Sequence, residues 1–477
     1  MNRRKFAGML GAAGAASMSL PHLKSFAQPG EDPPNVILVI LEDLNDWVGC
    51  MGGHMDSITP NLDAFAAGGT LFTNCHASAP ACNPARTAML SGLQPYTSGV
   101  YQNQDDWRDY IDASRMLPQQ LMNAGYHTAR IGKVYHGGYQ VNDHWDDIFK
   151  PSNTHDLGGP DPYLPNHPFH GMHNAINSSA DFHWGPSDNP EADFWDYQVM
   201  DYTTNQLQSG LPEPFFLAVG TRNVHYPAIV PRRYFERFNL QNLHVTDVNF
   251  DDLNDVPPAA QALVESWRLQ STIDHKNFHK AIQAYLASIN YVDDLVGWLL
   301  NSIAESAYAD NTAVIVLADH GQHLGEKTHW RKWTLWEESS LAYCAWQVPG
   351  LTTPGGVCRE AVSLVDVYPT LGEICDVTLP ENDGLSLVPQ LMNPVTPRAQ
   401  PAIITHDPGN FAVRDERFRY IQYAEGGEEL YDHDADPNEW YNLANDPDYQ
   451  GIKAQLAGWV PPGGVVPWTK KLRGEAR

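Results

Sequence analysis

The chain has 477 residues, 42% of them hydrophobic and 18% charged, and its formal net charge at pH 7 is −27. Its 14 Trp, 21 Tyr and 16 Phe exclude a disordered chain, and its length fits one large domain with a smaller one. The acidity excludes a nucleic-acid-binding surface, because phosphate contacts need basic patches.

The first residues have the pattern of an export signal. Asn2-Arg3-Arg4-Lys5-Phe6 precedes an apolar run from Ala7 to Leu20, and Ser25-Phe26-Ala27 has the small residues of a cleavage site. This segment resembles a twin-arginine signal peptide. The run is shorter than the ~20 residues of a spanning helix, so we expect no integral membrane segment. The protein is predicted to be exported, to the periplasm or the extracellular space.

Strands alternate with helices along the next part of the chain. Apolar, largely β-branched runs predict strands buried on both faces of a parallel sheet, at Asn35–Ile40, Thr128–Ile131, Phe215–Val219 and Thr312–Leu317. Helical patterns lie between them, at Pro60–Ala67, Leu117–Ala124 and Lys280–Ser302. This order predicts an α/β fold with a large, mostly parallel central sheet flanked by helices. Ligands of such sheets bind beyond the carboxyl ends of the strands.

Two segments depart from this alternation. Residues 138–201 are rich in Pro, Gly, Asp, His and Trp, which predicts long ordered loops that shape a substrate pocket. After a Pro-rich break, four short strands are predicted to form a small antiparallel sheet, at Ala402–Thr405, Phe411–Arg414, Tyr420–Tyr423 and Glu429–Tyr431. We therefore expect a signal peptide over 1–27, a large domain that carries the chemistry over 28–398 and a C-terminal subdomain over 399–477.

Carboxylates follow two of the predicted strands. Glu42-Asp43 follows the first, and Asp319-His320 follows the strand that ends near residue 318. Because parallel strands end at the same edge, these side chains are expected to meet there. Three carboxylates and an imidazole suit Ca²⁺ or Mg²⁺ better than zinc. The alternative is that Glu42-Asp43 caps a turn and Asp319 begins a loop.

Cys82 begins the segment Cys82–Gly92, in which Pro84 suits the first turn of a helix. Cys82 would then lie at a helix N-terminus, where unpaired N–H groups favour negative charge. The alternative is a buried structural cysteine. The six scattered cysteines allow one or two disulfides and contain no zinc-binding pair.

These motifs resemble the formylglycine-dependent (type I) sulfatases of the alkaline-phosphatase-like superfamily. Cys82–Gly92 fits their C-x-P-S/A-R signature with its following Leu, Ser or Thr, and Gly. Further matches follow in family order, at Thr59–Asp63, Gly125–His136, Ala318–Gly321 and Glu429–Pro437. Similarity to the iduronate-2-sulfatase-like branch lies in Lys133–His136, in Phe215–Gly220 before His225, and in Trp330–Lys332.

The resemblance implies a sulfatase that hydrolyses sulfate esters on a sulfated carbohydrate, either a polysaccharide or an oligosaccharide. A separate formylglycine-generating enzyme would oxidise Cys82 to Cα-formylglycine, whose aldehyde hydrates to a gem-diol nucleophile. A divalent metal, Ca²⁺ or Mg²⁺, would be bound by Glu42, Asp43, Cys82, Asp319 and His320. Family members usually have Asp at the position of Glu42.

The resemblance also implies roles for five further residues. Arg86 would hold the diol, and Lys133 and Lys332 would neutralise sulfate oxygens. His225 would protonate the departing alcohol, and His136 would take a proton from the remaining hydroxyl to expel sulfate. The alternatives are solvated surface lysines and structural histidines.

Residues that determine specificity are harder to identify from the sequence. Basic or aromatic side chains near the matched motifs suit sugar stacking and anionic subsites, or are surface ion-pair partners: Trp107, Arg108, Arg222, Arg232 and Arg233. Two other functions stay open. One is a phosphoester or phosphonate hydrolase on the same scaffold, and the other is a non-catalytic sugar-binding relative.

Overall fold

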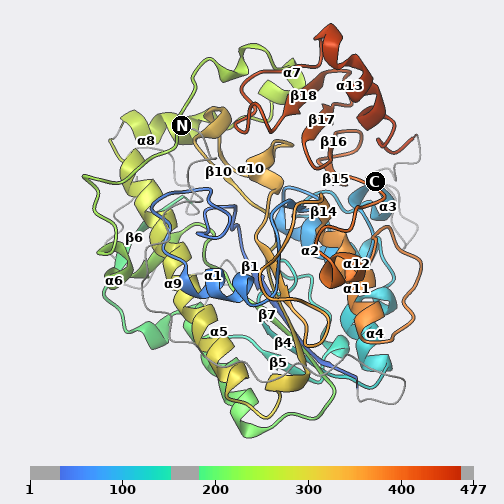
Figure 1. Cartoon of the computed structure of the whole chain (residues 1–477). Helices are drawn as coiled ribbons and strands as arrows, with labels where there is room; N and C mark the ends of the chain where they lie inside the picture. Colours follow the sequence, from blue (N-terminus) through green and yellow to red (C-terminus); the bar gives the residue numbers. More distant parts are fainter. Residues whose placement is uncertain (1–32, 152–181, 275, 463–477) are drawn as a thin grey trace.

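The computed structural model describes residues 33–151, 182–274 and 276–462. An eight-stranded sheet with helices on both faces forms its centre (Figure 1). In spatial order its strands are β13 (Gly356–Cys358), β2 (Thr70–Phe72), β12 (Cys344–Gln347), β9 (Thr312–Ala318), β1 (Asn35–Leu41), β7 (Phe215–Gly220), β4 (His127–Gly132) and β5 (Asp147–Phe149). Only β12 runs antiparallel to its neighbours among these described strands, so the predicted α/β class is confirmed. The predicted signal peptide lies outside the described residues.

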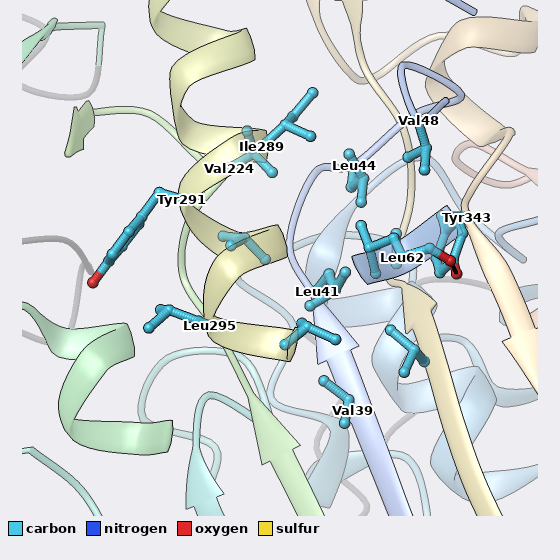
Figure 2. Close-up of a cluster of buried hydrophobic side chains, with 14 of the residues drawn as sticks. Val39, Leu41, Leu44, Val48, Leu62, Val224, Ile289, Tyr291, Leu295 and Tyr343 are labelled. Atoms are coloured by element: carbon cyan, nitrogen blue, oxygen red, sulfur yellow. Dashed lines mark hydrogen bonds between the residues drawn. The ribbon is translucent and has the colours of Figure 1, made fainter. Parts of the chain in front are cut away.

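Strand β1 shows why the sheet is buried on both sides. Ile37, Val39 and Leu41 face one hydrophobic core, and the residues between them face the other. The first core is covered by α1 (Pro60–Ala67), α5 (Trp195–Ser209) and α9 (Phe278–Ala304), and Figure 2 shows side chains of α1 and α9 around β1. The second is covered by α2 (Cys82–Ser91), α4 (Leu117–Asn123) and α11 (Val367–Ile374).

Shorter elements complete this part of the chain. The helices are α3 (Pro95–Ser98), α6 (Arg232–Phe235), α7 (Pro258–Gln261), α8 (Ser266–Asp274), α10 (Glu337–Ser340) and α12 (Val388–Met392). Three strand pairs are β3 (Cys75–His76) with β14 (Val362–Ser363), β6 (Trp184–Ser187) with β8 (Ala228–Pro231), and β10 (His323–Leu324) with β11 (Trp330–Arg331). Within the described ranges, no helix has the length and apolarity needed to cross a membrane.

The prediction of loops throughout residues 138–201 is wrong in the described parts. Strand β5 is the edge strand of the central sheet and pairs parallel with β4. Strand β6 and the first turns of α5 also fall in this range. The two strands have only three and four residues, too few for a periodic pattern to reveal them. Residues 152–181 of the predicted loop lie outside the described residues.

The C-terminal part contains a four-stranded antiparallel sheet, as predicted. Its strands are β15 (Ala402–Thr405), β16 (Phe411–Arg414), β17 (Phe418–Gln422) and β18 (Glu428–Asp432), each paired with the next. One face of this sheet packs on Leu335 and Trp336, and the other packs on α13 (Gln450–Ala457). The C-terminal sheet is therefore packed directly against the segment that follows β11.

A buried ion-pair cluster joins this sheet to α10. Glu337 accepts hydrogen bonds from Arg414 Nε at 3.1 Å and from Arg419 Nε at 3.1 Å. Burial alone would raise the pKa of Glu337, but the charges of Arg414, His433 and Arg419 outweigh it and hold that pKa well below 4.5. The carboxylate therefore stays charged at neutral pH and stabilises the junction.

We expect Glu337→Gln to lower the free energy of unfolding at pH 7 by about 3–5 kcal/mol, because it removes the carboxylate that pairs with buried Arg414, whereas Arg419 keeps its ion pair with Glu439. Since the folded-state pKa of Glu337 is depressed, its stabilisation is present above about pH 4.5 and is lost as the pH falls further. The variant should therefore lose less stability than the wild type on acidification. Urea unfolding at several pH values measures this, with the exposed Glu305→Gln as control. An equally steep acid dependence in Glu337→Gln would contradict the assignment.

Candidate active site

The ends of β1 and β9 bring four polar side chains together. The two strands pair in parallel through their last residues, so Glu42-Asp43 and Asp319-His320 leave the sheet side by side. The backbone N–H of Asp43 donates to Asp319 Oδ1 at 3.1 Å. All four side chains are buried. They form one cluster, as expected for groups at the carboxyl ends of neighbouring parallel strands.

Cys82 is the first residue of α2, and its Sγ lies in this cluster. Sγ is 3.2 Å from Lys332 Nζ, 3.3 Å from His320 Nε2 and 3.4 Å from Glu42 Oε1. Burial raises the pKa of the thiol to about 11, although the charge of Lys332 opposes the change. Desolvation thus outweighs any stabilisation of an anion by the helix N-terminus. An unmodified Cys82 is a neutral thiol at pH 7 and a poor nucleophile.

Each of the three carboxylates is paired with a cation. The pairs are Arg86 Nε with Asp319 Oδ2 at 2.8 Å, Lys332 Nζ with Asp43 Oδ1 at 2.7 Å, and Lys133 Nζ with Glu42 Oε1. Side-chain exposure is 13% for Lys133 and 1% for Lys332. Both lysines therefore differ from the solvated surface lysines that the sequence left open.

The donor atoms of the cluster fit a hard divalent cation. Oδ2 of Asp43 is buried and has no hydrogen-bond partner. Two sets of candidate ligand atoms each lie within 4.8 Å of one another: those of Cys82, Asp319 and His320, and those of Glu42, Asp43, Cys82 and His225. Carboxylate oxygens with an imidazole are a donor set for Ca²⁺ or Mg²⁺. The extra methylene of Glu42 leaves its carboxylate within the cluster.

The two predicted histidines are both neutral at pH 7. Nδ1 of His225 donates to the Tyr226 carbonyl, and its Nε2 lies 3.0 Å from Nη2 of Arg331. Burial, with the charges of Lys332 and Arg331, holds the pKa of His225 well below 6.5. Burial, with the charge of Lys133, lowers the pKa of His136 to about 3, and its Nδ1 is buried without a partner.

Lys332 lies in a segment with unusual backbone geometry. Four residues around it have φ between 49° and 79°, in the left-handed region: Lys327, Thr328, Arg331 and Trp333. Such conformations cost about 1–3 kcal/mol each for residues other than glycine and tend to occur at functional sites. Spacing in the sequence does not reveal them, and Arg331 was not predicted as a site residue.

Anchors on both sides hold this segment. Lys327 Nζ lies 2.8 Å from Asp252 Oδ1 and also contacts the Glu439 carbonyl. Nε2 of His329 donates to the Lys332 carbonyl at 2.7 Å. The catalytic candidate Lys332 is thus positioned by residues distant in the chain.

The specificity candidates separate into surface and site residues. Three arginines form ion pairs at the surface: Arg108 with Asp106, Arg232 with Asp188, and Arg233 with Glu191. Trp107 is fully buried and stacks on Tyr135. Arg222 is buried too, with its guanidinium carbon 3.8 Å from the ring centroid of Trp195. Arg222 alone of this set lines a cavity with Lys133, whose pKa is held well below 10.5 by burial and by nearby positive charges that include Arg222.

All six cysteines fall in the described part of the chain, and none of them forms a disulfide. Five are buried, and Cys50 is partly exposed. The disulfides that the sequence allowed are therefore absent among these residues. The buried thiols other than Cys82 act as small apolar groups.

This fold and this site define the class of protein. A mostly parallel sheet carries carboxylates, an imidazole and lysines at its carboxyl edge. The Sulfatase family model matches residues 34–377, and a model described as N-sulphoglucosamine sulphohydrolase, C-terminal, matches residues 325–460. The chain belongs to the sulfatase family and is a sulfuric ester hydrolase.

Similar proteins agree with this family. A sulfatase of Formosa agariphila is 33% identical over 464 residues, which cover 92% of this chain and 88% of the relative. Human iduronate 2-sulfatase is 28% identical over 401 residues, 73% of this chain and 70% of the relative. The crystal structure of a phosphonate monoester hydrolase of Agrobacterium radiobacter has a TM-score of 0.72 and 21% identity, covering 89% of this chain and 94% of that one. This last likeness shows a shared fold.

Two glycines let the ends of β4 and β7 approach closely beside Lys133. A Cβ on Gly220 would lie 1.8 Å from the Lys133 carbonyl oxygen, and one on Gly132 would lie 2.3 Å from the Gly220 carbonyl oxygen. The same Lys133 carbonyl accepts a hydrogen bond from Arg86. The position of both cations therefore depends on the absence of a side chain at Gly220.

We expect Gly220→Ala to lower the free energy of unfolding by about 1–3 kcal/mol through overpacking, and to reduce turnover at least about tenfold because Lys133 is displaced. Urea unfolding and steady-state kinetics on an aryl sulfate measure both effects. Gly451→Ala in α13 is the control, since its Cβ would meet no atom within 4 Å. That control should be neutral or stabilising by about 0.5–1 kcal/mol. Wild-type activity in Gly220→Ala would contradict the proposed placement of Lys133.

Proposed function

We propose that the protein hydrolyses sulfate esters on a sulfated carbohydrate, with Cys82 converted to Cα-formylglycine and a divalent cation beside it. The observation that carries this proposal is the contact of Cys82 Sγ with Lys332, His320 and Glu42. Once hydrated, the aldehyde of a formylglycine supplies a hydroxyl nucleophile in place of a neutral thiol. A carbohydrate substrate is supported by the similarity to iduronate 2-sulfatase.

Glu42, Asp43, Asp319 and His320, together with residue 82, would hold the cation, which is Ca²⁺ or Mg²⁺. When bound, the cation polarises the S–O bonds of the ester and lowers the pKa of the attacking hydroxyl. The orphaned Oδ2 of Asp43 supports this assignment, because a buried carboxylate oxygen otherwise has a hydrogen-bond donor.

The cations of the site bind and orient the reacting groups. Lys133 and Lys332 would neutralise sulfate oxygens as the S–O bond breaks. Arg86 is fixed by Asp319 through Nε, while its Nη2 is buried without a partner. Nη2 is therefore the atom that would donate to the hydroxyl of residue 82.

Two histidines would move the protons. Nδ1 of His225 donates to the Tyr226 carbonyl and Nε2 of the neutral ring accepts from Arg331, so Nε2 would have to take up a proton from solvent before it passes one to the departing alcohol oxygen. His136, with its orphaned Nδ1, would take a proton from the hydroxyl that remains on residue 82, which expels sulfate. Both histidines are only partly buried.

The proposal also includes the maturation of Cys82 and the location of the protein, the latter from its N-terminal segment. A formylglycine-generating enzyme would modify Cys82, and the twin-arginine-type segment over 1–27 would direct export to the periplasm or beyond the cell. Residues 28–398 would form the catalytic domain and residues 399–477 the C-terminal subdomain.

The activity test compares an aryl sulfate with the matching aryl phosphate. We expect the wild type to prefer the sulfate, and mass spectrometry of the Cys82 peptide to find an aldehyde rather than a thiol. Cys82→Ser should fold and lose nearly all turnover, since a serine sulfate would have no second hydroxyl to expel sulfate. Preference for the phosphate would make the protein a phosphoester hydrolase on this scaffold. Full activity with an unmodified thiol would contradict the proposed conversion of Cys82 to formylglycine.

We expect removal of divalent cations to abolish turnover and to lower the unfolding temperature, because binding to the native state alone adds about 2.7 kcal/mol at a hundredfold excess over Kd. Thermal unfolding with and without EDTA, followed by addition of Ca²⁺ or Mg²⁺, measures this and tells the two ions apart. Asp319→Asn should lose the response to EDTA, whereas the exposed Asp310→Asn should keep it. Full activity of a preparation shown by elemental analysis to be metal-free would refute the site.

A further inference from the structure

The loop between β15 and β16 brings the C-terminal sheet to the catalytic cluster. Thr405, at the end of β15, donates its backbone N–H to the Ser78 carbonyl at 2.9 Å, four residues before Cys82. Further along the loop, the carboxylate of Asp407 accepts a hydrogen bond from the side chain of Gln102. These contacts place a polar loop of the small sheet beside the helix that begins at Cys82.

Gln102 connects Asp407 to the residue that follows Cys82. Nδ2 of Asn83 donates to the Gln102 carbonyl at 2.9 Å, and the backbone N–H of Asn83 donates to Asn103 Oδ1 at 2.9 Å. Asn83 is buried, whereas Gln102, Asn103 and Asp407 are each partly exposed. Asp407 therefore lies at the solvent-facing edge of the site, with one side chain between it and Asn83.

Trp333 borders the same edge of the site and directly follows Lys332. Its backbone N–H donates to the Pro80 carbonyl at 3.2 Å. The residue is partly exposed, and its ring meets that of His406, with 6.4 Å between centroids and an interplanar angle of 88°. His406 immediately precedes Asp407 in the loop. An indole beside a carboxylate suits a sugar, because the ring packs against C–H groups and the carboxylate accepts from hydroxyls.

Trp333 and Asp407 both have backbone conformations in the left-handed region. The φ angle is 79° at Trp333 and 59° at Asp407. A bulky residue such as tryptophan rarely adopts a positive φ. Such conformations persist where the surrounding structure holds them, and they cluster at active sites and ligand-binding sites. The two side chains are thus held at this edge by a backbone that an unconstrained chain would avoid.

The carboxylate of Asp407 has capacity for further hydrogen bonds. Its Oδ1 accepts from Gln102, while its Oδ2 accepts no hydrogen bond from the described residues. Nδ1 of His406 lies 3.5 Å from Oδ2. Burial lowers the pKa of His406 below 6.5, so this ring is neutral at pH 7 and does not offset the charge of Asp407. The free lone pairs of a partly exposed carboxylate can accept from a ligand hydroxyl.

We propose that Trp333 and Asp407 bind the sugar ring whose sulfate ester is cleaved, the indole against its C–H groups and the carboxylate on its hydroxyls. Lys332, the residue before Trp333, lies 3.2 Å from Cys82 Sγ, so a sulfate held at the catalytic cluster leaves its sugar at this edge. A carboxylate repels anions, so the side of the sugar that faces Asp407 carries hydroxyls. The proposal rests on the proposed sulfatase function and adds the groups that recognise its sugar.

The kinetic test compares an aryl sulfate with the monosulfated sugar that the wild type turns over fastest, and with monodeoxy analogues of that sugar. Asp407→Asn fits the left-handed backbone and should lower kcat/KM on the sugar about tenfold more than on the aryl sulfate, because the charged acceptor is lost. At least one analogue should lose about tenfold in the wild type and less in the variant, since both changes remove one hydrogen bond. Asp376→Asn, at an exposed residue with φ of 52°, is the matched control and should leave these ratios unchanged.

Binding gives a second measurement that needs no turnover. In a Cys82→Ala background, calorimetry should show that Trp333→Ala weakens the monosulfated sugar about tenfold and leaves inorganic sulfate unchanged, whereas Trp333→Phe retains most of the sugar affinity. An equal loss for inorganic sulfate would mean that Trp333 only positions Lys332, and would overturn its contact with the sugar. Unchanged sugar binding in Trp333→Ala, or equal losses on sugar and aryl sulfate in Asp407→Asn, would overturn the subsite. Absence of turnover on the aryl sulfate and on every sugar by the wild type would instead overturn the proposed function.

Discussion

Six charged side chains lie almost wholly out of water near the ends of β1, β4 and β9, and every carboxylate among them contacts a cation. A buried ion without a partner lowers the stability of the folded state by several kcal/mol, so each of these charges needs its partner in place. Parallel pairing of β1 with β9 places the carboxylates side by side. Helix α2, the end of β4 and the segment after β11 then supply the cations. The fold around the site satisfies this charge balance.

The sequence predicts the parts of this arrangement that depend on local pattern. Strands β1 and β9 are uninterrupted apolar runs, and the acidic residues that follow them share an edge because the strands are parallel. The antiparallel β12 and the three-residue β5 carry no such pattern. The raised pKa of Cys82 depends on burial by segments far away in the chain, which a helix start does not reveal. The left-handed backbone around Arg331 likewise depends on tertiary anchors.

The sequence also does not reveal which arginines lie near the site and which form ion pairs at the surface, for a physical reason. Arg222 and Arg232 are ten residues apart and chemically identical, yet Arg222 stacks on a buried indole while Arg232 pairs with Asp188 at the surface. What separates them is whether the chain around each is covered by other elements. Pattern and charge predict that cations are present, and packing decides which of them lies near the site.

The anchoring of Lys327 sets an order of events during synthesis. Its side chain contacts the Glu439 carbonyl and lies over the ring of Tyr431, so the native contacts of the segment that carries Lys332 are complete only after these residues have emerged. Roughly 350 residues separate Cys82 from that point, which at about 5–20 residues per second is roughly 20–70 s. In the finished fold Cys82 is 1% exposed. Until then, the contacts that bury this thiol are incomplete.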